Sequence, residues 1–164
     1  MSAIHHSIVT LRIYGDDLVP QDITKMLGVS PTHSAIKGQQ TSVSPTTGKV
    51  AFAKAGMWRL CASDREPEDI DGQIREIFSQ ITANVAVWQS ITKKYRANLF
   101  CGVFMSETND GLSIPPQSMA VLAERGIELW FDIYAPLQDI APTDLCPCKS
   151  GKTYEECCAT KTST

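Results

Sequence analysis

Four of the six cysteines lie within thirteen residues near the end of the chain: Cys146, Cys148, Cys157 and Cys158. Zn²⁺ in structural sites favours four tetrahedral sulfur or nitrogen ligands, and four thiolates leave no open position for a substrate water. A segment of this length buries too little surface to fold alone, so a bound metal would supply much of its stability. We therefore predict a structural Zn²⁺ site with these four cysteines as ligands.

Three other interpretations of the cysteine cluster stay open. The thiols could form a redox-active dithiol, a disulfide between the adjacent Cys157 and Cys158, or unrelated surface groups. The ligand type and the spacing favour zinc. The remaining Cys61 and Cys101 fall in expected strands, where we interpret them as small buried apolar residues.

The rest of the chain predicts an α+β domain with the element order β-α-β-α-β-α-β. Apolar residues alternate with polar ones from Ser7 to Tyr14, which indicates a half-buried strand. Pro20 and Gly28 bracket a short helix, and Asn84 marks a break in a long amphipathic stripe that extends to Ile91. The expected strands span 7–14, 57–62, 98–105 and 127–134, and the expected helices span 20–27, 70–81 and 116–125.

These elements suit a two-layer sandwich, ferredoxin-like in kind, with helices on one side of a single sheet. Residues 30–54 are rich in Ser, Thr, Pro and Gly and are interpreted as a long loop, with an irregular hairpin as an option around 43–52. The strand order is left open. The expected organisation is an α/β domain at 1–136, a linker at 137–145, a zinc knuckle at 146–158 and a flexible tail at 159–164.

A second candidate site lies on the expected sheet. Alternation places Arg12 and Tyr14 on one face of the first strand, and Trp130, Asp132 and Tyr134 on one face of the last. If these strands are neighbours, Arg12 and Asp132 meet in an aromatic-lined patch. The candidate ligand or partner surface comprises Arg12, Tyr14, Trp58, Trp130, Asp132 and Tyr134. The residue types favour a plainer interpretation, a solvent-facing sheet surface with a cross-strand ion pair.

The charge balance and the N-terminus restrict the classes of partner. The chain has 15 Lys and Arg against 18 Asp and Glu, a net charge of −3, which disfavours nucleic acid and an RNA platform of stacked aromatics. The sequence shows no secretory signal and no long apolar run, so we expect a cytoplasmic protein without membrane insertion. The histidines His5, His6 and His33 have no recognisable nucleophile nearby, so no catalytic residue is predicted.

Several short strings resemble a known bacterial family, the domain of unknown function 4279. The resemblance covers about residues 7–135 and implies a compact α/β domain without an assigned catalytic residue. The strings that carry the resemblance are Leu11–Asp16, Gly28–Thr32, Lys37–Gly38, Gly56–Trp58 and Phe131–Tyr134.

Residues 146–158 resemble the SEC-C motif, named for the zinc-binding tail of the bacterial secretion motor ATPase. Besides the four cysteines, the sequence keeps Pro147, Ser150, Gly151, Lys152 and Tyr154. The resemblance implies zinc binding and often a protein-interaction role, as in the motor's contact with an export chaperone.

The function expected from these observations is that of a zinc-binding, cytoplasmic adaptor or protein-interaction module, more in keeping with a binding protein than with an enzyme. An enzyme or small-ligand-binding domain with purely structural zinc is the first alternative. An immunity-like protein that neutralises a toxin by occluding it is the second. The oligomeric state, the pathway and the partner's identity are not determined by the residues.

Overall fold

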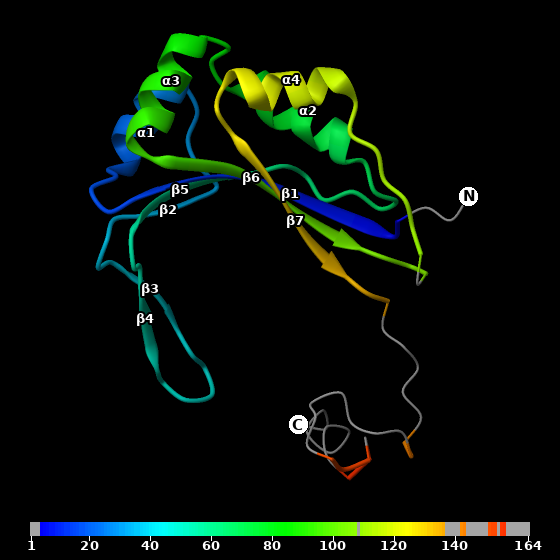
Figure 1. The fold of residues 1–164 in the computed structure, drawn as a ribbon. Helices are drawn as coiled ribbons and strands as arrows, with labels where there is room; N and C mark the ends of the chain where they lie inside the picture. Colours follow the sequence, from blue (N-terminus) through cyan, green and yellow to red (C-terminus); the bar gives the residue numbers. More distant parts are fainter. Residues whose placement is uncertain (1–3, 108, 137–141, 144–150, 154, 157–164) are drawn as a thin grey trace.

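The fold is described by a computed structural model for residues 4–107, 109–136, 142–143, 151–153 and 155–156. Over these residues the chain forms seven strands and four helices (Figure 1). The strands are β1 (His6–Gly15), β2 (His33–Ala35), β3 (Gln40–Val43), β4 (Val50–Phe52), β5 (Gly56–Cys61), β6 (Arg96–Phe104) and β7 (Glu128–Tyr134). The helices are α1 (Pro20–Leu27), α2 (Ile70–Gln80), α3 (Val85–Lys94) and α4 (Pro116–Glu124).

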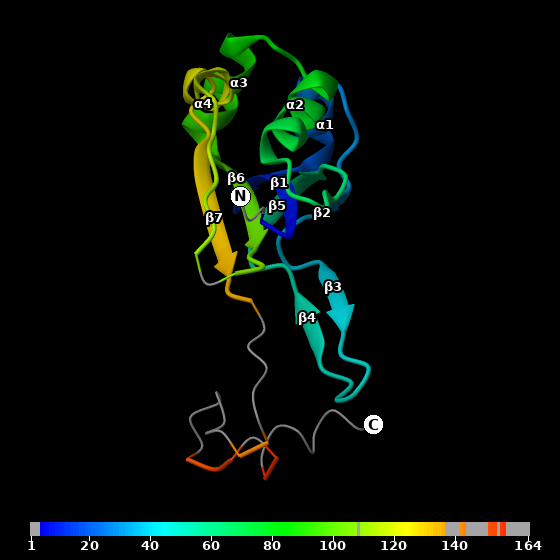
Figure 2. The same cartoon turned by 90° about the vertical axis from the view of Figure 1, so that its right-hand side faces the viewer.

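Five of these strands form one mixed sheet in the order β2-β5-β1-β6-β7. The central strand β1 runs antiparallel to both of its neighbours, β5 and β6, whereas β6 and β7 run parallel. The helices lie on one face of the sheet, and the separate hairpin β3–β4 projects beyond it on the other side (Figures 1 and 2). One face of the sheet is therefore covered by helices, and among the described residues no helix covers the opposite face, which is called the open face below.

The core lies between the helices and the covered face. In β1 alternate residues are buried, because successive side chains of a strand point to opposite faces. Each helix adds buried residues at helical spacing, such as Ile74 and Ile77 on α2. The large side chains with almost no exposure are Trp58, Trp88, Leu11, Ile13, Leu18, Ile23, Leu27, Ile70, Ile74, Ile77, Ile91 and Leu99.

Local signals fix the helix ends. Pro20 begins α1, and Gly28 ends it in the left-handed conformation with φ of 84°, which glycine adopts without steric cost. The Asp69 carboxylate caps α2 by accepting a hydrogen bond from the backbone N–H of Gly72 at 2.9 Å. Asn84 caps α3 in the same manner, so it starts a second helix.

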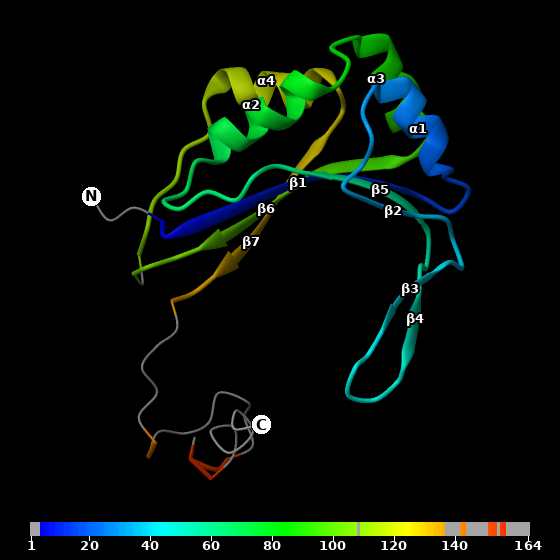
Figure 3. The same ribbon diagram turned by 180° about the vertical axis from the view of Figure 1, so that it is seen from behind.

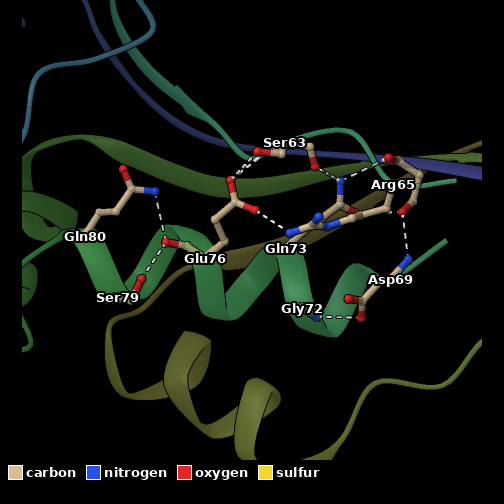
Figure 4. A network of polar contacts seen from close by, with 9 residues as sticks. Ser63, Arg65, Asp69, Gly72, Gln73, Glu76, Ser79 and Gln80 are labelled. Carbon is tan, nitrogen blue, oxygen red and sulfur yellow. Dashed lines mark hydrogen bonds and ion pairs between the residues drawn. The ribbon is translucent and has the colours of Figure 1, made fainter.

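A buried polar network ties α2 to the strands beneath it (Figure 4). The Gln73 side-chain amide donates to the carbonyls of Ser7 and Ser63, at 3.0 and 2.9 Å, and its oxygen accepts from the Ser7 hydroxyl at 2.7 Å. At the rim of this network Glu76 accepts from the Ser63 N–H and from Arg65. The Ser63 N–H contributes most to lowering the pKa of Glu76. These bonds fix α2 against the start of β1 and the end of β5.

The α+β architecture predicted from the sequence, with helices on one side of a sheet, is confirmed. The predicted order β-α-β-α-β-α-β is wrong, because β2, β3 and β4 are additional strands and the optional break at Asn84 does start a fourth helix. The segment expected as a long loop holds β2 and the hairpin β3–β4, close to the option considered around 43–52. The ferredoxin-like assignment is not confirmed. That unit joins two strands directly in its middle, whereas α2 and α3 lie between β5 and β6 here. Of the predicted linker at 137–145 only residues 142–143 are described, and the predicted tail and four cysteine ligands lie outside the described residues.

Candidate functional site

The open face of the sheet presents the polar and aromatic residues that alternate with the core positions. On β1 these are Thr10, Arg12 and Tyr14, each half-buried. The strand register aligns a row across four strands, in which Arg59 of β5 faces Arg12, Arg12 faces Asn98 of β6, and Asn98 faces Glu128 of β7. Partners in register lie on the same face, so these side chains form one surface.

Arg12 is the centre of this surface. Its Nε donates a hydrogen bond to Asn98 Oδ1 at 2.8 Å. The guanidinium carbon lies 4.3 Å from the Phe100 ring centroid and 5.7 Å from that of Trp130, on the next strands. Cation–π contacts of this kind are favourable by about 0.5–1 kcal/mol at exposed sites and more where water is excluded. The contacts hold the guanidinium in a fixed orientation.

The electrostatic environment of Arg12 follows from the same packing. Burial lowers the pKa of its guanidinium, and the neighbouring positive charge of Arg59 lowers it further, whereas Tyr14 has the opposite effect. An arginine side chain starts so far above neutral pH that it stays protonated. The site therefore keeps a permanent, partly desolvated positive charge, which is suited to binding an anionic or aromatic group.

A second aromatic group lies at the far end of the open face. The rings of Phe104 and Tyr134 stack with centroids 4.6 Å apart, and His6 stacks on Phe104 at 4.9 Å. The Tyr134 hydroxyl donates to Asp132 Oδ2 at 2.7 Å, and this hydrogen bond raises the pKa of Tyr134. A cavity of about 410 Å³ adjoins these rings, lined in part by Met105.

The predicted meeting of Arg12 and Asp132 does not occur. The two strands are not neighbours, because β6 lies between them. In addition, Asp132 is in register with Gly102, which faces Ile8 four residues before Arg12. Asp132 instead accepts the hydrogen bond from Tyr134.

The structure also places Trp58 away from the predicted surface. It lies opposite Ile13 on the covered face and is fully buried, with its indole N–H donating to Thr24 Oγ1 at 3.1 Å. Residues that sequence reasoning missed are Arg59, Asn98, Phe100 and Phe104. These residues occupy the alternate positions of β5 and β6 that point to the open face. The strand register decides which alternate positions those are, so the residues can be identified only once the register is known.

The cysteines fall into two groups. Cys146, Cys148, Cys157 and Cys158 lie outside the described residues, so their predicted role as zinc ligands stays a prediction. Within the described ranges, no group of three or more His, Cys, Asp or Glu residues is arranged to hold a metal ion. Of the motif residues that are described, Gly151 has a positive φ of 78°, a conformation that glycine adopts without steric cost.

Cys61 and Cys101 differ from each other. Cys101 is buried in β6, as predicted, and burial raises the pKa of its thiol to about 12. Cys61 is half-buried on the open face, where its sulfur accepts a hydrogen bond from the Thr10 hydroxyl at 3.6 Å. The expectation of a buried apolar residue is therefore wrong for Cys61, because its parity in β5 turns it away from the helices.

The fold and the open face define a single α+β domain followed by a cysteine motif, and comparison with protein families identifies both parts. The family model "Domain of unknown function (DUF4279)" matches residues 3–136, and the SEC-C motif matches residues 143–160. The chain belongs to the DUF4279 family. No curated protein and no solved structure gives a significant match. None of the described helices is long and apolar enough to cross a membrane.

Proposed function

We propose that this protein is a cytoplasmic adaptor that binds structural Zn²⁺ through its SEC-C motif and a protein partner through the open face and outer edge of its DUF4279 domain. The motif match and the four cysteines support the zinc site. Four thiolates complete the tetrahedral coordination of Zn²⁺. They therefore suit a structural site and leave no open coordination position for catalysis. The metal would stabilise the motif as a second contact for the partner.

The observation that carries the partner site is the exposure of large apolar residues on β7. Trp130 is 46% exposed and Ile133 is 59% exposed, and Phe131 and Tyr134 are exposed as well. Trp130 and Tyr134 lie on the open face, and Phe131 and Ile133 lie on the other, so apolar side chains flank the strand on both sides. Exposed large apolar residues gathered on one element of a folded domain commonly mark an interaction surface. Trp, Tyr and Arg are also the residue types that contribute most to binding at protein interfaces.

The backbone of β7 supports the same site. It is the last strand of the sheet, and within the described part of the chain no strand pairs with its outer edge. Free strand edges bind extended segments by backbone hydrogen bonds, while side-chain pockets supply specificity. We expect the partner to add a strand to β7, with its side chains contacting Trp130 on the open face and Ile133 on the other.

The zinc site is tested by the metal content of the full chain purified without chelators or a metal-binding tag. We expect about one zinc per chain, based on one four-cysteine site. The double variant Cys146→Ser and Cys148→Ser should lose it, and the control Cys61→Ser should keep it. Absence of zinc under reducing conditions would contradict the proposal and make thiol redox chemistry the next question.

The partner site is tested by placing a photo-crosslinking residue at Ile133 of β7 and, as a control, at Gln89 of α3, both exposed in the free domain. We expect a specific partner to crosslink at the first position only. Its affinity for the purified full chain should then fall at least about tenfold in the double variant Trp130→Ala and Ile133→Asp. Partner binding that survives loss of the zinc ligands would remove the motif from the recruitment role.

A further inference from the structure

A polar cavity is lined by residues of β2, of β5 and of the base of the hairpin β3–β4. These elements lie at the edge of the sheet away from β7 (Figure 3). Its volume is about 380 Å³, within the range of small-ligand sites. Among the described residues, the lining carries hydrogen-bond donors and one permanent cation but no carboxylate. The polar residues that line it include His33, Gln39, Gln40, Thr41 and Arg59.

The charges at this end of the open face are unbalanced. Arg59 and Arg12 face each other directly across β5 and β1, and both guanidinium carbons lie within 6 Å of the Tyr14 ring, at 5.8 and 5.9 Å. Like charges in directly opposed positions of a sheet destabilise each other. Among the described residues neither arginine forms an ion pair. The acidic residue in the same row, Glu128, is separated from Arg12 by Asn98.

Arg59 also has an unsatisfied donor. Its Nε is buried and has no hydrogen-bond partner among the described residues. An unpaired buried donor is costly, and a charged one more so. The carbonyl oxygen of the neighbouring Gln39 side chain already accepts the Ile36 N–H at 3.1 Å, so the amide group of Gln39 keeps its donors for a ligand.

We infer that this cavity binds an oxyanion, a phosphate or carboxylate group of a small ligand. Arg59 would bind it in the bidentate geometry that guanidinium forms with such anions, and Arg12 would supply the second positive charge. The amides of Gln39 and Gln40 and the imidazole of His33 offer further hydrogen bonds. The bound anion would relieve the repulsion between the two arginines. This site does not depend on the proposed adaptor function.

The test is thermal unfolding of the purified full chain in sodium phosphate or in sodium succinate, with ionic strength held constant by sodium chloride. An anion that binds only the folded state at ten times its dissociation constant should raise the Tm by about 3–5 °C. Arg59→Gln should abolish the rise, and Arg12→Gln should reduce it. The control Arg75→Gln removes the same charge from α2 on the covered side and should leave the rise intact.

The two anions distinguish the ligand class. A rise in phosphate alone assigns a phosphate group, and a rise in succinate alone assigns a carboxylate. Should Arg59→Gln fold poorly, Arg59→Lys keeps the charge but loses the bidentate contact and should bind at least about tenfold more weakly. The Nε–H resonance of Arg59 should move during the titration. An unchanged resonance, an equal Tm rise in the Arg59 variants, or no rise with either anion would overturn the inference.

These outcomes are separate from those of the adaptor proposal. The measurement needs neither the partner nor the metal, so the variant lacking the zinc ligands should show the same Tm rise with the anion. Failure of the anion site would leave crosslinking at β7 unaffected.

Discussion

The two faces of β1, a strand of ten residues, differ in burial and in residue type. Val9, Leu11 and Ile13 point into the helix layer and are almost fully buried. The alternate residues Arg12 and Tyr14 point to the open face, where they are half-buried among polar and aromatic neighbours. One strand therefore contributes core residues through its odd positions and a polar and aromatic surface through its even ones, because the pleat points the two sets to opposite faces.

The interactions on the two faces also differ in how much they stabilise the fold. Burying a large aliphatic side chain stabilises a fold by about 1.5–3 kcal/mol, whereas a partly exposed cation–π contact contributes about 0.5–1 kcal/mol. Substitutions on the open face should accordingly change binding far more than folding. Substitutions on the covered face should do the reverse.

The largest expected effect is that of Trp58→Ala on the covered face. The change removes a fully buried indole and its hydrogen bond to Thr24, so the free energy of unfolding should fall by about 3–5 kcal/mol. Trp130→Ala on the open face is the matched control and should cost about 1 kcal/mol or less. Urea denaturation of both variants checks the contrast, and equal losses would show that the open face is also part of the core.

Gln73→Leu should have the next largest effect, because Gln73 is a buried polar residue on the covered side and its side chain makes several hydrogen bonds. Its loss leaves the carbonyls of Ser7 and Ser63 without this donor and the Ser7 hydroxyl without its acceptor. We expect the free energy of unfolding to fall by about 1–3 kcal/mol, measured by the same urea denaturation. Gln80→Leu, on the same helix but exposed, is the control. A stabilised Gln73→Leu variant would show that apolar packing outweighs the network.

The smallest expected effect concerns Asp132→Asn on the open face. The hydrogen bond to Asp132 raises the pKa of Tyr134, so the variant should bring that pKa back toward about 10, followed by NMR of the Tyr134 ring. A raised pKa means that the folded state holds the proton more tightly. The contribution to stability is therefore present below about pH 10 and is lost as the pH rises through the folded-state pKa.

Local periodicity was enough to predict most of the long elements. The alternation in β1, the stripe of α2 and the cap at Asn84 each depend on interactions between residues close in sequence. The strands β2, β3 and β4 have three or four residues each and mostly exposed side chains, so none is long enough to show an alternation of apolar and polar residues. Their pairing is determined by contacts that no local window contains.

The candidate surface could be predicted only in part, because it too depends on contacts between residues far apart in sequence. Sequence reasoning found Arg12 and Trp130, because Arg and aromatic residues at alternating positions are visible within each strand. It could not place β6 between β1 and β7, so it paired Arg12 with Asp132 and missed Phe100. It also assigned Trp58 to the wrong face, because the parity of a short apolar strand is set by its register with β1.

The position of β1 in the sheet has a consequence for synthesis of the chain. This strand is made early, yet both of its neighbours come later, and His6 pairs with Phe104. At the usual rate of about 5–20 residues per second, the intervening segment takes roughly 5–20 s to make. During that interval β1 has no partner on its β6 side, so Val9, Leu11 and Ile13 remain incompletely packed in the nascent chain. Among the strands of the sheet, the central strand β1 thus has the longest interval between its own synthesis and that of its last neighbour.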